Sequence, residues 1–543
     1  MNNSIFKFER PNNEPIYGYM PNSEERRLLK EELQRQSSIE IEIPLIIGGK
    51  EVKTGNLGKV VMPHNHSHVL AIYHKATAET VEMAITAAMK AKQAWANLPW
   101  TERAAVSLKI AELISKKYRY LLSAATMLGQ SKNPYQAEID CPCEAIDFLR
   151  FNPYFASQVY ENQPKSENSH LDRLEYRPLE GFVYAITPFN FTAIACNLAM
   201  SPVIMGNVVV WKPATTAILS NYYLMQIYKE AGLPDGVINF IPGQGNVISD
   251  VVFNHKSLSG IHFTGSTSTF DNFWKVIGNN ISKYNTYPKI VGETGGKDFI
   301  FVHKSANIET AAAAMVRGAF EYQGQKCSAA SRAYVPKSLW DKTLSLLKKL
   351  IGDIKMGDVC DFRNLMNAVI DEKSFDTIMS YIEKAKTASD AEVVIGGGGD
   401  KSKGYFIQPT VILAHNPRFT SMEEEIFGPV LTIHVYDDDK YEETLGVCDQ
   451  TSPYALTGAL FATDRYAIKT GEEKLKYACG NFYINDKPTG AVVGQQPFGG
   501  ARRSGTNDKA GFYTNLMRWV SPQAIKETFN PSTQIEYPYM SDN

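Results

Sequence analysis

Short, continuously apolar segments alternate with longer segments of helical periodicity through much of this chain. Phe182–Ile186 and residues 208–211 are apolar at every position, which is typical of strands buried on both faces of a parallel sheet. An apolar helix ending near Gly206 lies between them, and a helix from about Leu219 to Gly232 follows the second. Repeated strand–helix–strand units predict an α/β fold with a doubly wound parallel sheet.

The same alternation begins again after Gly295 and Gly296, with a strand at 299–302, a helix beginning near Asn307 and further units to about Ile484. We therefore expect two α/β lobes, with ligand sites near their junction, because crevices of this kind favour ligand binding. The other elements expected are helices within 77–132 and 138–151 and strands at 237–241 and 260–263.

Composition narrows the class of protein. The 543 residues are 44% apolar and 21% charged, as in globular proteins of two or three domains. The net charge of −2 gives no basic footprint, so no nucleic-acid partner is expected. No apolar run is long enough to span a bilayer, and residues 1–11 do not resemble a signal peptide, so we expect a cytoplasmic protein without a membrane partner.

The cysteines and histidines predict neither disulfides nor a metal site. Seven cysteines are too sparse for a disulfide framework, and the spacing of Cys141 and Cys143 matches no zinc motif, so we interpret them as thiols in a helical region. His64, His66 and His68 alternate and would share one face of a strand, which is compatible with a metal site. No cysteine or carboxylate cluster accompanies them, and a polar surface strand explains them better. We expect no metal.

Three segments have residues suited to covalent catalysis. Cys327 lies in a loop after an Ala-rich helix, beside Lys326, whose charge could favour the nucleophilic thiolate. Glu293 stands among glycines at the end of an apolar strand and could act as a general base. Asn190 follows a buried strand, and its amide could stabilise an oxyanion. Taken singly, each has a structural explanation: a buried cysteine, a helix-capping glutamate and a turn asparagine.

Three further segments have residues suited to a dinucleotide. Trp211–Lys212–Pro213 and residues 263–267 each follow a strand, where doubly wound sheets bind such ligands, although no G-x-G-x-x-G motif is present. Residues 424–429 place a carboxylate and an aromatic ring close together, suited to a ribose and a nicotinamide, although a capped turn would explain them too. The combination of all six segments, rather than any one of them, indicates an enzyme.

In chain order, PFNF, WKP, FTGS, GETGGK, GQKCS and EEIFGPV resemble the signature motifs of the aldehyde dehydrogenase superfamily, and the resemblance covers nearly the whole chain after about Lys50. It implies that Cys327 is the nucleophile that forms a thiohemiacetal and then a thioester. It also implies that Asn190 and the Cys327 backbone N–H form the oxyanion hole, and that Glu293 activates the hydrolytic water. A catalytically silent protein of this fold is the alternative, but such a protein would be expected to lose the thiol or the base.

The resemblance implies NAD as the cofactor. Lys212 and Glu425 resemble the partners of ribose hydroxyls, Phe427 packs near the nicotinamide, and further residues line the cofactor cleft, namely Thr187, Ala214, Gly265 and Ser266. The chain departs from the common pattern at two positions. Phe270 replaces a frequent glycine, and Thr215 replaces a frequent acidic residue that favours NAD over NADP.

The stretch from Gly480 to Arg502 resembles the branch of the superfamily that oxidises L-glutamate γ-semialdehyde to glutamate in proline breakdown. A Gly-rich loop can direct backbone N–H groups at a carboxylate. The substrate residues expected are Lys326, Ser328, Gly490, Ala491, Phe498 and Phe191, with the two phenylalanines enclosing the aliphatic carbons. Ala491 stands where serine is common, so one hydroxyl contact is absent. A dehydrogenase for another small semialdehyde, such as succinate semialdehyde, is the alternative.

The expected architecture follows from these assignments. An NAD-binding domain with an N-terminal arm covers 1–157 and 181–297, and a catalytic domain covers 298–502. A small β oligomerisation element, combining a hairpin with the C-terminal tail, covers 158–180 and 503–543. The resemblance implies a homodimer or a larger homo-oligomer.

Overall fold

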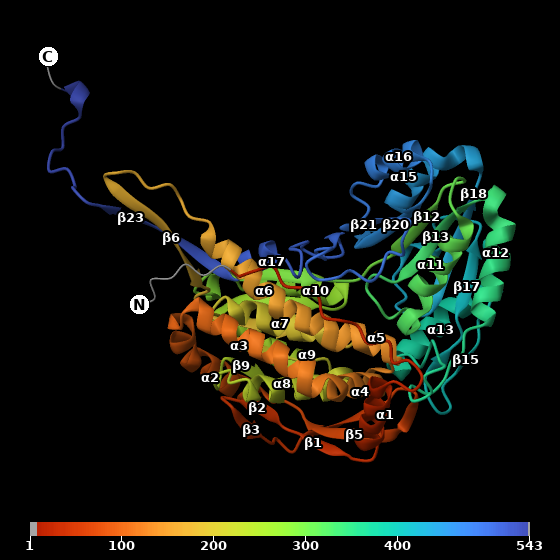
Figure 1. The fold of residues 1–543 in the computed structure, drawn as a ribbon, viewed down its shortest axis with the longest axis horizontal. Coiled ribbons are helices and arrows are strands. Elements are labelled where there is room, and N and C mark those ends of the chain that lie inside the picture. Colours follow the sequence, from red (N-terminus) through yellow and green to blue (C-terminus); the bar gives the residue numbers. More distant parts are fainter. Residues whose placement is uncertain (1–7, 541–543) are drawn as a thin grey trace.

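The computed structural model describes residues 8–540. Two seven-stranded sheets, each covered by helices on both faces, form two lobes that lie side by side (Figure 1). The predicted α/β class with two mainly parallel sheets is confirmed. Among the described residues, no helix is long and apolar enough to cross a membrane, and no group of three or more His, Cys, Asp or Glu side chains is arranged to hold a metal.

The first sheet has the order β11-β10-β7-β8-β9-β2-β3, and its first five strands are parallel. β2 and β3 are an antiparallel pair at the edge, which the sequence pattern did not predict. The register aligns the ends of neighbouring strands, with Ile186 beside Lys212 and Thr264 beside Glu293. The strands are β2 Leu45–Ile47, β3 Lys50–Val52, β7 Phe182–Ile186, β8 Val209–Lys212, β9 Ile238–Phe240, β10 Leu258–Thr264 and β11 Lys289–Glu293.

Strand β7 explains why this sheet is covered on both faces. Phe182, Tyr184 and Ile186 belong to one core, and Val183 and Ala185 belong to the other, because successive side chains of a strand point to opposite faces. The first core contains α2 Ala78–Asn97, α9 Gly245–Asn254 and α10 Thr267–Asn279. The second contains α1 Glu24–Ser37, α3 Trp100–Leu113, α4 Arg119–Gln130, α6 Glu144–Glu161, α7 Thr192–Ile204 and α8 Ile218–Glu230.

The second sheet has the order β14-β17-β18-β13-β12-β20-β21 and is parallel except for the edge strand β14. It repeats the two-core arrangement, with helices α11 and α12 on one face and α13, α15 and α16 on the other. These elements are β12 Asp298–Val302, α11 Ile308–Phe320, β13 Ala330–Pro336, α12 Lys337–Gly352, α13 Glu372–Thr387, β14 Ala391–Ile395, β17 Thr410–Ala414, β18 Val430–Tyr436, α15 Tyr441–Thr451, β20 Thr457–Phe461, α16 Arg465–Lys474 and β21 Asn481–Ile484.

Smaller elements surround the lobes. Strand β6 His170–Pro178 pairs along its whole length with β23 Val520–Thr528, and this two-stranded ribbon projects from the body (Figure 1). The partner of β6 is therefore the distant C-terminal strand rather than a second strand of a local hairpin. The remaining elements are β1 Ile41–Ile43, β4 Leu57–Met62, β5 Asn65–His74, α5 Pro134–Glu138, β15 Gly399–Asp400, β16 Phe406–Ile407, α14 Thr420–Glu423, β19 Tyr454–Ala455, β22 Ala501–Arg502 and α17 Tyr513–Met517, with π-helical turns at Ile114–Tyr118 and Ile139–Cys143 and 3₁₀ turns at Thr215–Ala217, Ile281–Lys283, Glu321–Gly324, Asp438–Lys440 and Pro538–Met540.

Candidate active site

Two cavities meet at Cys327, which is half-buried. One has a volume of about 740 Å³ and lies over the carboxyl ends of β7, β8 and β10 in the first lobe. The other, of about 270 Å³, lies between α6, the loop after α11 and the segment 487–498. Of the residues that the structure describes, Cys327 is the one that lines both cavities. A nucleophile placed there can face two ligands at once.

A tight turn after α11 positions Cys327. Tyr322, Gln323 and Gly324 have φ values of 51°, 55° and 67°, in the left-handed region that side chains rarely adopt. The Gln323 amide holds this turn in place by donating to the carbonyls of Ser131 (3.0 Å) and Ala368 (2.8 Å). The backbone of the loop is therefore fixed from outside before it reaches the thiol.

Asn190 lies in the loop after β7, is buried, and lines the larger cavity. Its Nδ2 donates to the carbonyl oxygen of Gln325 at 3.0 Å, two residues before Cys327. An amide nitrogen has a second hydrogen, so this bond orients the side chain and leaves one N–H to donate. The position agrees with the predicted role as an oxyanion donor.

Glu293 ends strand β11, but its side chain lines neither cavity. The Glu293 carboxylate accepts a hydrogen bond of 2.8 Å from the Gly500 backbone N–H, which holds it against the loop that follows the second lobe. Burial raises the pKa of Glu293 well above its usual range. In this arrangement the carboxyl group is close enough to affect the charge of Cys327 but is turned toward residues 499–505.

The surroundings of Cys327 do not favour the thiolate. Burial raises the pKa of the thiol well above its usual value, and the carboxylates of Asp298, Glu293, Glu425 and Glu144 raise it further. The expectation that Lys326 promotes the thiolate is wrong, because its ammonium is directed into the smaller cavity and forms an ion pair with Asp140 at 3.3 Å. The thiol is therefore protonated at neutral pH in this state of the protein.

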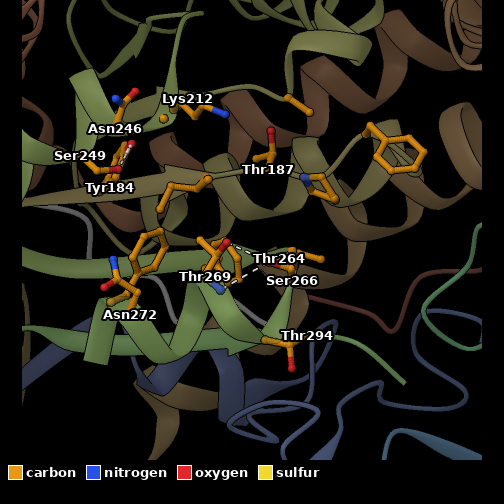
Figure 2. A pocket seen from close by; sticks show the side chains of 18 of the residues that line it. Tyr184, Thr187, Lys212, Asn246, Ser249, Thr264, Ser266, Thr269, Asn272 and Thr294 are labelled. Atoms are coloured by element: carbon orange, nitrogen blue, oxygen red, sulfur yellow. Dashed lines mark hydrogen bonds between the residues drawn. The ribbon is translucent and has the colours of Figure 1, made fainter. Parts of the chain in front are cut away.

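All seven residues predicted for the cofactor line the larger cavity: Thr187, Lys212, Ala214, Gly265, Ser266, Glu425 and Phe427. Lys212 ends strand β8, and its ammonium makes no hydrogen bond or ion pair with any residue from 8 to 540. Burial lowers its pKa to about 8. Ser266 caps helix α10 by accepting from the Thr269 N–H at 3.3 Å, so the positive end of the helix dipole faces the cavity (Figure 2).

Glu425 and Phe427 come from the second lobe and close the cavity near Cys327. The Glu425 carboxylate accepts from the Gly296 N–H at 3.0 Å, and burial raises its pKa to about 7. Phe427 has a φ of 57°, and its ring meets the edge of Phe189 at 5.8 Å. The two lobes therefore contribute opposite walls of one site.

The far end of this cavity is polar and was not predicted. Figure 2 shows Tyr184, Asn246, Ser249 and Asn272 along its wall, with a 3.2 Å hydrogen bond between the Tyr184 and Ser249 hydroxyls. The sequence gives little indication of this polar wall, because α9, which carries Asn246 and Ser249, begins without a capping side chain that would mark its start. Phe270 and Thr215, the two positions at which the chain departs from the common pattern, are not among the residues that line this cavity. The Phe270 ring is buried and stacks on Phe263 with 5.5 Å between the ring centroids.

The six residues predicted for the substrate all line the smaller cavity: Lys326, Ser328, Gly490, Ala491, Phe498 and Phe191. Ser328 donates its hydroxyl to Thr489 at 3.0 Å, which ties the catalytic loop to the loop at 490–496. Gly490 has a φ of 97°, a backbone conformation that requires glycine. The structure thus brings together two segments far apart in the chain around one small cavity.

A buried charged cluster in the same cavity was missed. Asp140 accepts a 2.6 Å hydrogen bond from the fully buried Lys132 and lies 3.3 Å from Lys326. Burial and, to a smaller extent, the charge of Asp140 raise the pKa of the nearby Glu144 to about 8. Polar residues at positions 140, 144 and 147 within an apolar helical region were the available signal, since neighbours at this spacing share one helix face.

Comparison with known proteins agrees with this geometry. The chain matches the Aldehyde dehydrogenase family over residues 52–525. The mitochondrial delta-1-pyrroline-5-carboxylate dehydrogenase of Dictyostelium discoideum is 53% identical over 535 residues, which cover 98% of this chain and 96% of that protein. The NAD-bound crystal structure of the delta-pyrroline-5-carboxylate dehydrogenase of Mycobacterium tuberculosis has a TM-score of 0.96 at 50% identity, covering 99% of this chain and 100% of that one. An NAD-bound 1-pyrroline-5-carboxylate dehydrogenase from Thermus has a TM-score of 0.90 at 33% identity, with coverage of 96% and 100%.

The chain therefore belongs to the aldehyde dehydrogenase family, and the resemblance predicted from its motifs is confirmed. Within that family, the relatives described above, which match it over nearly their whole length, are delta-1-pyrroline-5-carboxylate dehydrogenases.

Proposed function

We propose that this protein is an NAD-dependent dehydrogenase that oxidises L-glutamate γ-semialdehyde, the open form of 1-pyrroline-5-carboxylate, to L-glutamate in proline catabolism. The observation that carries the proposal is the position of Cys327 at the junction of a large cavity suited to a dinucleotide and a small one suited to a charged, short aldehyde. The proposal is supported by the delta-1-pyrroline-5-carboxylate dehydrogenases that share about half of their residues with this chain.

The larger cavity fits NAD by its chemistry. The Lys212 ammonium and the Glu425 carboxylate suit ribose hydroxyls, and the N-terminus of α10 suits the pyrophosphate. Phe427 and Phe189 offer an apolar face near Cys327. When bound, NAD accepts the hydride that leaves the aldehyde carbon.

Covalent catalysis is assigned to the groups around Cys327. The thiol gives its proton to water, its sulfur attacks the aldehyde carbon, and a C–S bond forms while the carbonyl oxygen becomes an oxyanion. The Asn190 amide and the Cys327 backbone N–H stabilise that charge. After oxidation to a thioester, Glu293 takes a proton from water, the water oxygen attacks the acyl carbon, and the C–S bond breaks. Because Glu293 is held by Gly500, this last step requires its side chain to rotate toward Cys327.

Substrate recognition is assigned to residues that line the smaller cavity. Backbone N–H groups of the loop at Gly490 and Ala491, with the Ser328 hydroxyl, suit the α-carboxylate. The carboxyl group of Glu144, which lines the same cavity, suits the α-ammonium on the same carbon atom, and a bound cation would restore its ionised form. Phe191 and Phe498 suit the carbon chain that joins this amino-acid end of the substrate to the aldehyde group at Cys327.

The proposal is tested by NADH formation with 1-pyrroline-5-carboxylate in the wild type and in Cys327→Ala. We expect the substitution to lower kcat by roughly 10³-fold or more, because no nearby group replaces the thiol. Cys360→Ala, which removes an exposed thiol in the same lobe, is the matched control and should retain full activity. Turnover that survives in Cys327→Ala would contradict the assignment of the nucleophile.

A substrate panel separates the proposed substrate from succinate semialdehyde, which lacks the ammonium group. The proposal expects the higher kcat/KM with 1-pyrroline-5-carboxylate, and it expects Glu144→Gln to reduce that preference. A preference for succinate semialdehyde would keep the catalytic mechanism and overturn the substrate.

We further infer a homo-oligomer, a dimer or larger, assembled through the β6–β23 ribbon. The domain boundaries and the cytoplasmic location given above remain predictions. The outer edge of β6 is hydrogen-bonded to residues 163–167, so the edge that another copy can cover is that of β23. The Dictyostelium relative is named as mitochondrial. Cell fractionation, with a mitochondrial marker as control, distinguishes the two locations.

A further inference from the structure

An N-terminal arm, residues 8–22, forms part of the wall of the smaller cavity. It contains no helix or strand, yet Asn13, Glu14 and Ile16 are among the residues that line the cavity. None of the sequence motifs indicated that this part of the chain reaches the site. A segment without its own backbone ladder is held in place only by the contacts it makes with the body of the protein.

The C-terminal part of the arm is anchored by buried charges. The Glu14 carboxylate accepts from Arg119 and Arg150, both at 2.6 Å, and from the Ser115 hydroxyl at 2.7 Å. Tyr19 donates its hydroxyl to the buried Glu138 at 2.6 Å. Charged groups that are buried and paired in this way are costly to separate, so this end of the arm is fixed.

Asn13 joins the two walls of the cavity. Its Nδ2 donates to Asp147 Oδ2 on helix α6 at 2.8 Å and to the carbonyl oxygen of Val493 at 2.8 Å. Its Oδ1 accepts from Gln495 Nε2 at 2.9 Å. Both amide hydrogens and the amide oxygen are therefore engaged, which only an amide side chain of this length can do. Beside it, Arg10 Nη2 donates to the Gly494 carbonyl at 2.5 Å.

The wall that Asn13 holds is the loop 490–496, whose backbone adopts conformations that favour glycine. Gly490 and Gly494 both have left-handed φ values, of 97° and 80°. The flexibility of glycine makes such a loop expensive to order without external contacts. In the proposed function this loop provides the N–H groups for the substrate carboxylate, so its distance from helix α6 sets the affinity.

We propose that Asn13 is a positioning residue that clamps loop 490–496 to helix α6 and thereby sets the affinity for the amino-acid end of the substrate. The inference rests on the proposed function for its consequence in catalysis, but the clamp itself is a property of the folded chain. Asn13 acts through the loop and takes no part in the chemistry at Cys327.

The kinetic test compares Asn13→Ala with Asn12→Ala, its exposed neighbour, using 1-pyrroline-5-carboxylate and propionaldehyde, which has no carboxylate or ammonium. We expect KM for 1-pyrroline-5-carboxylate to rise roughly 10-fold, because the loop loses its hydrogen bonds to Asn13, with kcat within about two-fold. Asn12→Ala should match the wild type. An equal loss with both aldehydes, or no change in KM, would overturn the proposal.

Two further measurements test the clamp, and the first of them does not depend on activity. Hydrogen exchange of the 490–496 amides should be faster in Asn13→Ala than in Asn12→Ala. Gln495→Ala should have a similar effect on KM, and the double variant should be less than additive, since both changes break the same contact. Unchanged hydrogen exchange in Asn13→Ala would refute the clamp. If exchange is faster in Asn13→Ala but the wild type is inactive toward 1-pyrroline-5-carboxylate, only the proposed substrate is refuted.

Discussion

The thiol of Cys327 and the carboxyl group of Glu293 both have pKa values raised above their usual ranges, first of all by burial. Each must lose its proton to act, the thiol as a nucleophile and the carboxyl group as a base. A raised pKa delays that loss as pH increases, so the acid limb of the activity profile is displaced toward alkaline pH. The same surroundings protect the thiol from oxidation and alkylation while the enzyme is idle.

The contribution of Glu293 to the thiol can be measured directly. In Glu293→Gln the side chain keeps its size and loses its negative charge, so the pKa of Cys327 should fall. Alkylation of Cys327 by iodoacetamide, followed against pH in a Cys360→Ala background, should then reach its half-maximal rate at a lower pH than in the parent.

Glu372→Gln is the control, because Glu372 is an exposed carboxylate of the same lobe paired with Lys401. It should leave the alkylation profile in place. An identical profile in Glu293→Gln and in the parent would show that the Glu293 carboxylate does not act on the thiol.

At the scale of elements, the active site is assembled where strands end and turns are strained. β7, β8 and β10 lead into the loops or residues that carry Asn190, Lys212 and Ser266, and α11 leads into the turn before Cys327. Parallel strands align their carboxyl ends at one edge of the sheet, which explains why residues so far apart in sequence share a cavity.

Gly324 tests the importance of the catalytic turn. Its φ is 67°, and a Cβ atom there would lie 2.2 Å from the carbonyl oxygen of Gly428. We expect Gly324→Ala to displace the turn, lower stability by about 2 kcal/mol and reduce kcat, because backbone strain and a clash act together. Thermal unfolding and steady-state kinetics provide the measurements.

Gly232→Ala separates the two causes. Gly232 also has a left-handed φ, of 90°, but a Cβ atom there would have no neighbour within 4 Å. This control should lose only about 1 kcal/mol from the backbone strain and should keep its kcat. If both variants behave alike, the contact with Gly428 is not what restrains the turn.

At the scale of the whole molecule, the β6–β23 ribbon and the segment after it are exposed (Figure 1). Large apolar side chains project from them, with 40% of Leu171, 62% of Phe529 and 93% of Ile535 accessible. A two-stranded ribbon alone is marginally stable in water, and exposed apolar side chains of this size favour a partner surface. This supports the proposed assembly between copies of the chain.

Charge on the ribbon should disrupt that assembly. We expect the double substitution Leu171→Lys and Phe529→Lys to shift the protein to a smaller species in light scattering coupled to size-exclusion chromatography, because burying two ammonium groups is unfavourable. Leu57→Lys, on an exposed apolar position of β4, is the control. A wild type that is already monomeric, or an unaffected double variant, would contradict the proposal.

The sequence by itself determined the succession of the buried strands along the chain and the motif residues that line the two cavities at Cys327. Continuous apolar runs predict strands because both of their faces must be buried, and the motifs place Asn190 and Lys212 at a strand end or in the loop after it, where the structure has them. The antiparallel edge formed by β2 and β3 was not predicted, because short edge strands carry little periodic signal.

The tertiary structure alone decided which distant groups meet. Glu144, Asp140 and Asn13 reach the smaller cavity through packing between segments far apart in the chain, which no local pattern encodes. The same holds for charge: Lys326 stands next to Cys327 in sequence, yet its ammonium pairs with Asp140 and the thiol is left among carboxylates. Neighbours in sequence share a backbone, but the energy of a charge depends on its burial and on the groups nearest to it in space.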